Sequence, residues 1–210
     1  MSATIAEVAL VMFIGMGPIK VLVFYLTAIH DATPALAHRV ALRAVATATL
    51  TALGLLLAGA LLMRLLHFSG PALVVAGGIV LLAYGTQMVL RATPPDRVEV
   101  PPTEATLLRM AIYPMGVPLV LNPAGIAAAT IFSAEAATFN DLGAIAVIII
   151  AVSILDLVVL YVSRPLGPRL PREATLVLEQ LLGVLLAAVA VELIVVGLVG
   201  FGILDLPARH

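Results

Sequence analysis

Residues 144–152 read AIAVIIIAV, nine apolar side chains in succession without a polar interruption. They lie within a longer apolar segment, Leu142–Ser163, which is long enough to cross the ~30 Å hydrocarbon core of a bilayer as a helix. A strand of a membrane β-barrel alternates apolar and polar side chains instead. Because every backbone polar group in lipid needs an internal partner, we expect a transmembrane helix over this segment.

The composition extends this expectation to the whole chain. Of its 210 residues, 62% are hydrophobic and 11% are charged, and its mean hydropathy is +1.19. A soluble domain has about 25% charged residues. Five further segments are apolar and long enough to span: Ile5–Ala28, Arg39–Leu66, Pro71–Leu90, Thr106–Phe132 and Leu176–Ile203. The sequence therefore predicts an all-α polytopic membrane protein with six transmembrane helices.

Several functional classes are disfavoured by the same composition. The net charge is −1, which provides no basic surface for nucleic acid. The chain has no cysteine, and its four histidines have no metal-ligand spacing. We expect no enzyme activity, metal site or cofactor. The expected partners are the lipid bilayer and a small-molecule substrate, and a homo-oligomer remains an open alternative.

Basic residues indicate the orientation of the spans. Eight arginines lie in or beside the connections that follow spans one, three and five: Arg39, Arg43, Arg91, Arg97, Arg109, Arg164, Arg169 and Arg172. The opposite side carries Arg64 and Arg209. Cytoplasmic loops are enriched in arginine and lysine, so we expect both termini outside a bacterial or archaeal plasma (inner) membrane.

A weak internal repeat divides the chain into two halves. When the sequence is shifted by half its length, 105 residues, four pairs of breaker or polar positions coincide: Pro18 with Pro123, Thr51 with Asp156, Gly78 with Gly183, and Gln87 with Glu192. This pattern predicts two inverted three-helix repeats, residues 1–92 and 106–210, joined by a Pro-rich cytoplasmic linker at 93–105. Chance coincidence in apolar sequence is the alternative explanation.

The first span of each half contains helix-breaking residues. Span one carries Gly15-Met16-Gly17-Pro18, and span four carries Asn122-Pro123-Ala124-Gly125 after three earlier breakers, Pro114, Gly116 and Pro118. Proline removes a helical hydrogen bond, and an interrupted helix is tolerated in lipid where its backbone lines a cavity or is buried. We expect helices one and four to be broken near the midplane and to form a substrate site from Gly17, Pro18, Asn122, Pro123 and Gly125, with Gln87 nearby. Two kinked helices that only improve packing are the alternative.

Three charged residues lie well within the spans, namely Lys20, Asp156 and Glu192. Each costs at least ~2.5–3.5 kcal/mol at the bilayer centre on insertion scales. Lys20 and Asp156 are expected at similar depth, so we predict an ion pair between them. This pair is either a proton relay for coupling or a static pair that sets helix register. Glu192 is expected on the other side of the centre, with Gln87 as its counterpart.

Hydroxyl-bearing side chains have more local roles. We expect Thr47, Thr49 and Thr51 to bond their own helix backbone. Tyr25, Tyr113 and Tyr161 are expected to anchor the spans at the membrane interface.

Four stretches resemble the MarC family of six-span bacterial and archaeal membrane proteins. They are Gly17–Ile19, Ala76–Ile79, Tyr113–Gly125 and Leu182–Gly197. The resemblance covers nearly the whole chain and implies transport of small neutral amino acids. Four positions depart from the family pattern: Gly17 replaces an aspartate, Lys20 replaces a glycine, Asn122-Pro123-Ala124 replaces Gly-Pro-Gly, and Glu192 lies where a glutamine is usual.

Together these features predict a secondary transporter or exporter of a small polar solute, with a neutral amino acid such as alanine or glycine as the first candidate. Lys20, Asp156 and Glu192 would supply proton coupling, and one half would rock against the other. The alternative function is a non-transporting membrane scaffold or partner subunit, in which the polar residues serve packing only.

Overall fold

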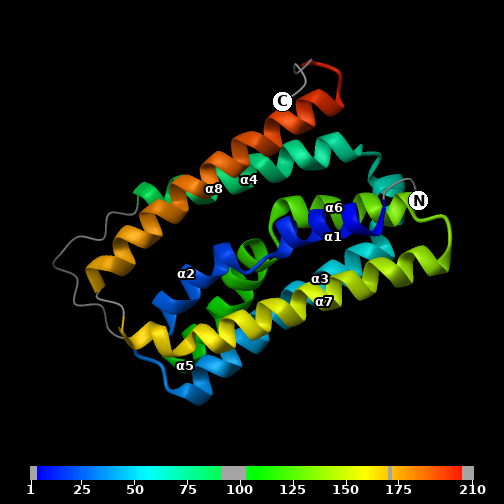
Figure 1. Ribbon diagram of the computed structural model, residues 1–210. Helices are drawn as coiled ribbons and strands as arrows, with labels where there is room; N and C mark the ends of the chain where they lie inside the picture. The colour runs from blue at the N-terminus through cyan, green and yellow to red at the C-terminus, as the bar shows by residue number, and fades with distance from the viewer. Residues whose placement is uncertain (1–3, 91–102, 170–171, 205–210) are drawn as a thin grey trace.

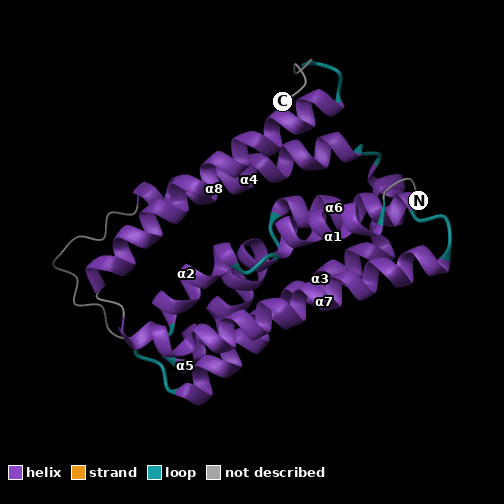
Figure 2. Ribbon diagram, in the orientation of Figure 1, coloured by secondary structure: helices purple, strands orange, loops and turns teal. Residues whose placement is uncertain are grey.

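A computed structural model of the chain describes residues 4–90, 103–169 and 172–204. Within these ranges the regular elements are all helical, and Figure 2 shows helices and connecting loops without a strand. The elements are, in order, α1 (Ile5–Met16), α2 (Ile19–Ala28), α3 (Pro34–Leu66), α4 (Gly70–Leu90), α5 (Glu104–Met110), η1 (Ala111–Val120), α6 (Pro123–Glu135), α7 (Phe139–Ser163), η2 (Arg164–Arg169) and α8 (Arg172–Gly200).

The helices agree with the predicted spans. Five candidate spans are long and apolar enough to cross a membrane, and the bent unit Glu104–Glu135 makes a sixth when its two parts are taken together. The second span begins at Pro34 rather than Arg39, because the Thr33 hydroxyl accepts a hydrogen bond from the Leu36 amide and caps the helix there. The all-helical polytopic architecture is therefore confirmed.

The predicted boundary between the two halves falls mostly outside the described residues. Of the linker expected at 93–105, only 103–105 are described. Thr103 caps α5, whose first two residues are Glu104 and Ala105. Helix α5 therefore begins within the last residues of the expected linker, at the Thr103 cap.

Each span packs against the span three places along the chain. In Figure 1, α4 and α8 run side by side in opposite directions, α3 and α7 form another such pair, and α1 lies beside α6. The remaining extensive contacts join α3 to α6 and η1, α4 to α6, and α1 to α7. The first and second halves of the chain are consequently interleaved rather than stacked as two separate bodies.

Glycines allow α4 and α8 to approach closely. A Cβ atom at Gly85 would lie 2.8 Å from the Gly183 carbonyl oxygen, and one at Gly183 would lie 2.9 Å from the Gly85 oxygen. A Cβ at Gly78 would lie 2.8 Å from the Ala190 oxygen. Lipid-facing Gly54, in contrast, has no atom within 4 Å of such a Cβ. Small residues at these crossings give the pair the backbone-to-backbone packing that stabilises helices in lipid.

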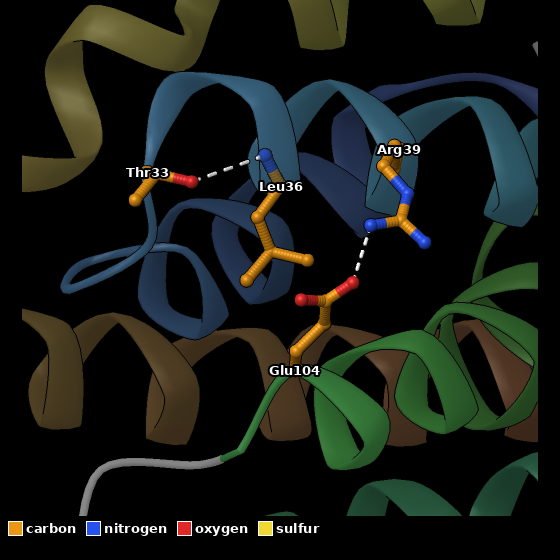
Figure 3. A network of polar contacts seen from close by, with 4 residues as sticks. All are labelled: Thr33, Leu36, Arg39 and Glu104. Atoms are coloured by element: carbon orange, nitrogen blue, oxygen red, sulfur yellow. Dashed lines mark hydrogen bonds and ion pairs between the residues drawn. The ribbon is translucent and has the colours of Figure 1, made fainter.

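An exposed ion pair connects the start of α3 to α5. Figure 3 shows the Arg39 guanidinium, in the second turn of α3, directed at the Glu104 carboxylate. Both side chains are more than half exposed, so the pair contributes little to stability. Its structural consequence is to hold the first turn of α5 beside the first turns of α3.

Candidate functional site

The first span is interrupted at Gly17 and Pro18. Gly17 has extended backbone angles (φ −64°, ψ 154°), and α2 begins directly after Pro18. Proline has no N–H, so the carbonyl of Ile14, four residues earlier, loses its helical donor. The interruption therefore leaves carbonyl groups at the end of α1 that need partners from elsewhere.

The fourth span is interrupted at Leu121 and Asn122, which have extended ψ angles of 96° and 169°. Pro123 is the first residue of α6, where its missing N–H and fixed φ are accommodated. The segments on the two sides of this break meet at a bend of 68°. Tyr113 and Val117 within η1 also leave helical geometry, each immediately before a proline.

The two interruptions bond to each other. The Asn122 side-chain amide donates to the Ile14 oxygen at 2.9 Å, and the Asn122 backbone N–H donates to the Gly15 oxygen at 2.9 Å. The Asn122 side-chain oxygen accepts from the Gly125 N–H at 3.1 Å and caps α6. Asn122 is 1% exposed. Asn122 therefore supplies donors to two carbonyls at the end of α1, those of Ile14 and Gly15.

Close backbone contact accompanies these bonds. A Cβ atom at Gly15 would lie 2.5 Å from the Gly125 Cα, and one at Gly125 would lie 2.7 Å from the Gly15 oxygen. Only glycine fits on either side of this crossing. In this conformation the Asn122 side chain, its backbone N–H and the Gly125 N–H are all bonded to protein atoms. A ligand site would therefore lie beside the junction.

A cavity of about 350 Å³ lies beside the start of α6. Its lining comes from α4, η1 and α6, and consists of Val80, Ala83, Tyr84, Gln87, Tyr113, Val117, Pro118, Pro123 and Ile126. The volume is in the range of small-molecule sites. Most of the lining is apolar, with side-chain polar groups on Tyr84, Gln87 and Tyr113. Of the predicted site residues, Pro123 and Gln87 line this cavity.

The other predicted substrate residues lie at the breaks. Gly17 and Pro18 form the interruption of the first span, and Asn122 and Gly125 join it to α6. The structure thus brings the two broken spans together, as expected, and places the cavity on the α4 side of their junction.

Asp156 is completely buried on α7, whose neighbours are α1, α2 and α3. Neither of its carboxylate oxygens has a hydrogen-bond partner among the side chains that the structure describes. Lys20 belongs to α2, but its side chain lies outside the described residues, so the ion pair remains a prediction. Glu192 is exposed on α8, which packs on α4 and α2.

One polar contact near Asp156 was not anticipated from the sequence. The hydroxyl of Thr49 on α3 lies 2.7 Å from that of Ser153 on α7, one turn before Asp156. The expected backbone bonds of Thr47, Thr49 and Thr51 are confirmed at 2.7–2.8 Å. Serine and threonine commonly bond their own helix, so the additional interhelical contact had no distinct sequence signal.

The expectation for Tyr25 was wrong. Tyr113 and Tyr161 are 67% and 50% exposed, but Tyr25 is fully buried and its hydroxyl donates to the Ala37 oxygen at 3.1 Å. A buried tyrosine needs a partner for its O–H, and the first turn of α3 supplies one. Tyr25 therefore connects α2 to α3 instead of contacting the interface.

These features define a multi-pass helical integral membrane protein with two interrupted spans in contact. The sequence profile of the MarC family integral membrane proteins matches residues 2–201, and the chain belongs to that family. The family description specifies an integral membrane protein and names no substrate.

Archaeal relatives match most of the chain. A UPF0056 membrane protein of Pyrococcus horikoshii is 25% identical over 193 residues, which cover 91% of this chain and 93% of the relative. Another from Methanocaldococcus jannaschii is 31% identical over 156 residues, covering 71% and 75%, respectively. No solved structure matches the chain.

Two substitutions of Asn122 should lower the stability of the junction by different amounts. Asn122→Ala removes both the α6 cap and the donor to Ile14, and we expect a loss of about 1–3 kcal/mol from the cap and the lost hydrogen bond together. Asn122→Ser keeps a capping hydroxyl but is too short to reach Ile14, and should lose about half as much. Reversible unfolding of the purified variants in detergent measures the loss of unfolding free energy in each. Equal stability of the alanine and serine variants would contradict the assigned roles.

Proposed function

We propose that this protein is a secondary transporter of a small neutral solute, with an amino acid such as alanine or glycine as the first candidate. The cavity beside the second break carries this proposal. It extends from Pro123, at an interrupted helix, to Gln87 near the end of α4. Polar groups on Tyr84, Gln87 and Tyr113 in an otherwise apolar lining suit a compact solute with hydrogen-bonding groups and no net charge.

We infer that the two halves form an inverted repeat, an arrangement that would suit an alternating-access mechanism. The shift of 105 residues that relates Gly78 to Gly183 also relates Gly85 to Ala190. The close contact between Gly78 and Ala190 thereby corresponds to the close contact between Gly183 and Gly85. A two-fold axis in the membrane plane produces such reciprocal contacts, and inverted repeats are common in secondary transporters.

The packing of the spans does not suit a mechanism in which one half of the chain rocks against the other. Because each span packs on its counterpart from the other half, the halves cannot separate without breaking the α4–α8 and α3–α7 interfaces. We propose instead that α4 and α8 move together against the remaining helices. Close backbone contacts at Gly78, Gly85 and Gly183 join the two helices, which run side by side in Figure 1, and would make them a rigid unit.

The coupling charge is proposed to reside at Asp156 and Lys20. A buried carboxylate without a hydrogen bond is costly in lipid and requires either a proton or a positive partner. Contact between α2 and α7 makes Lys20 the candidate partner by the placement of its helix. In this proposal the pair forms and separates as the transporter changes state, and a proton neutralises Asp156 when the pair is separated.

Filling the cavity should block transport. Ala83→Phe introduces a ring into the cavity lining, and we expect it to lower the initial rate of radiolabelled alanine uptake into proteoliposomes by about tenfold or more. Ala76→Phe makes the same change at an exposed α4 position outside the lining and serves as the matched control. Wild-type uptake by the Ala83 variant, or no amino acid flux in the wild-type protein, would contradict the proposal and favour a scaffold.

Removing the basic partner should uncouple or abolish flux. Lys20→Met leaves Asp156 without its counter-charge, so a proton gradient should no longer drive alanine accumulation. Lys20→Met/Asp156→Asn should recover most of the stability lost by Lys20→Met, because no buried charge remains unpaired. Arg64→Met, at the exposed end of α3, is the control for charge removal. Gradient-driven accumulation by Lys20→Met equal to that of the wild type would exclude a coupling role.

A further inference from the structure

The open cavity lies on one side of the centre of the α4–α8 pair. The reciprocal contacts Gly78–Ala190 and Gly183–Gly85 place the centre of this pair near Leu81 and Leu186, both almost completely buried. Gln87, which lines the cavity, is beyond this centre toward the C-terminal end of α4.

Glu192 lies on the opposite side of the same centre. The antiparallel pairing puts Gln87 level with Leu181, eleven residues before Glu192 on α8. At 1.5 Å per residue, this separates Gln87 and Glu192 by about 16 Å along the helix axis. The two residues, which correspond in the repeat, therefore face opposite halves of the membrane.

The α2–α8 boundary, on the helix that carries Glu192, corresponds in the repeat to the α4–α6 boundary, where the cavity lies. Apart from their mutual contact, α4 packs on α6 and α8 packs on α2, and α2 corresponds to α6 in the repeat. The cavity-lining residue Ile126 is partly exposed, whereas its counterpart Val21 is fully buried. In this conformation a cavity is present at the α4–α6 boundary beside Ile126, whereas Val21, at the corresponding position of α2, is covered.

Resting on the transport function proposed above, we propose that the α2–α8 boundary opens in the alternate state and that Glu192 then lines the pathway on the side opposite Gln87. A shift of the α4–α8 unit that closes the cavity at Ile126 would expose the equivalent surface at Val21. The two access routes differ chemically, since one presents an amide and the other a carboxylate. The carboxylate gives the Glu192 side a preference for solutes that carry an ammonium group.

Cysteine labelling of the full chain tests this pathway, and the chain has no native cysteine to remove. Single variants Gln87→Cys, Glu192→Cys and Ala188→Cys would be exposed to a membrane-impermeant charged methanethiosulfonate in right-side-out and inside-out membrane vesicles. Ala188 is an exposed residue one turn before Glu192 and corresponds to cavity-lining Ala83, so it preserves the test if the Glu192 variant does not accumulate. Val191→Cys, exposed on α8 beside Glu192, is the lipid-facing control.

We expect the Gln87→Cys variant to react from one side, and the Ala188→Cys and Glu192→Cys variants to react from the other. Each should react about tenfold or more faster than the Val191 control, because the reactive thiolate requires water. Labelling at 188 and 192 only from the Gln87 side, or no faster than the control, would overturn the pathway. Alanine uptake measured in parallel separates the two proposals: opposite-side labelling without flux would retain the pathway and reject the substrate.

Discussion

The hydrogen bonds between Asn122 and the end of α1 are the constraint on which the centre of this molecule depends. Pro18 removes the donor that the Ile14 carbonyl would use in a continuous helix, and no water is available in the membrane interior to replace it. Asn122 supplies that donor from the second interrupted span while its side-chain oxygen caps α6. The two breaks are therefore joined by hydrogen bonds that stabilise both.

This mutual arrangement explains why the candidate site lies beside the junction and not within it. The glycines at 15 and 125 bring the two backbones into direct contact, which leaves no space for a solute between them. The bend after η1 instead turns Pro123 toward α4 and creates the cavity there. A rigid, fully bonded junction next to a cavity can support a ligand site while the α4–α8 unit moves across it.

Much of this architecture could be predicted from the sequence, because spans in lipid follow from length and hydropathy alone. The broken spans were also predictable, since Pro18 and Pro123 have a direct effect on helical bonding. The residues that bond to the backbone carbonyls released at these breaks could not be predicted. Asn122 could be recognised as an unusual residue, but its contact with Ile14 depends on the crossing of two spans that are 108 residues apart. The burial of Tyr25 and the contact between Thr49 and Ser153 likewise depend on helix rotation, which apolar sequence specifies weakly because nearly all faces are hydrophobic.

A double-mutant cycle between positions 18 and 122 tests the central claim most directly. Pro18→Ala restores an N–H four residues after Ile14, so the carbonyl regains a helical donor and no longer depends on Asn122. We expect the destabilisation caused by Asn122→Ala to be smaller by about 1 kcal/mol or more in the Pro18→Ala background than in the wild-type protein. Unfolding free energies that add to within about 0.3–0.5 kcal/mol would show that the two breaks are independent and would contradict this account.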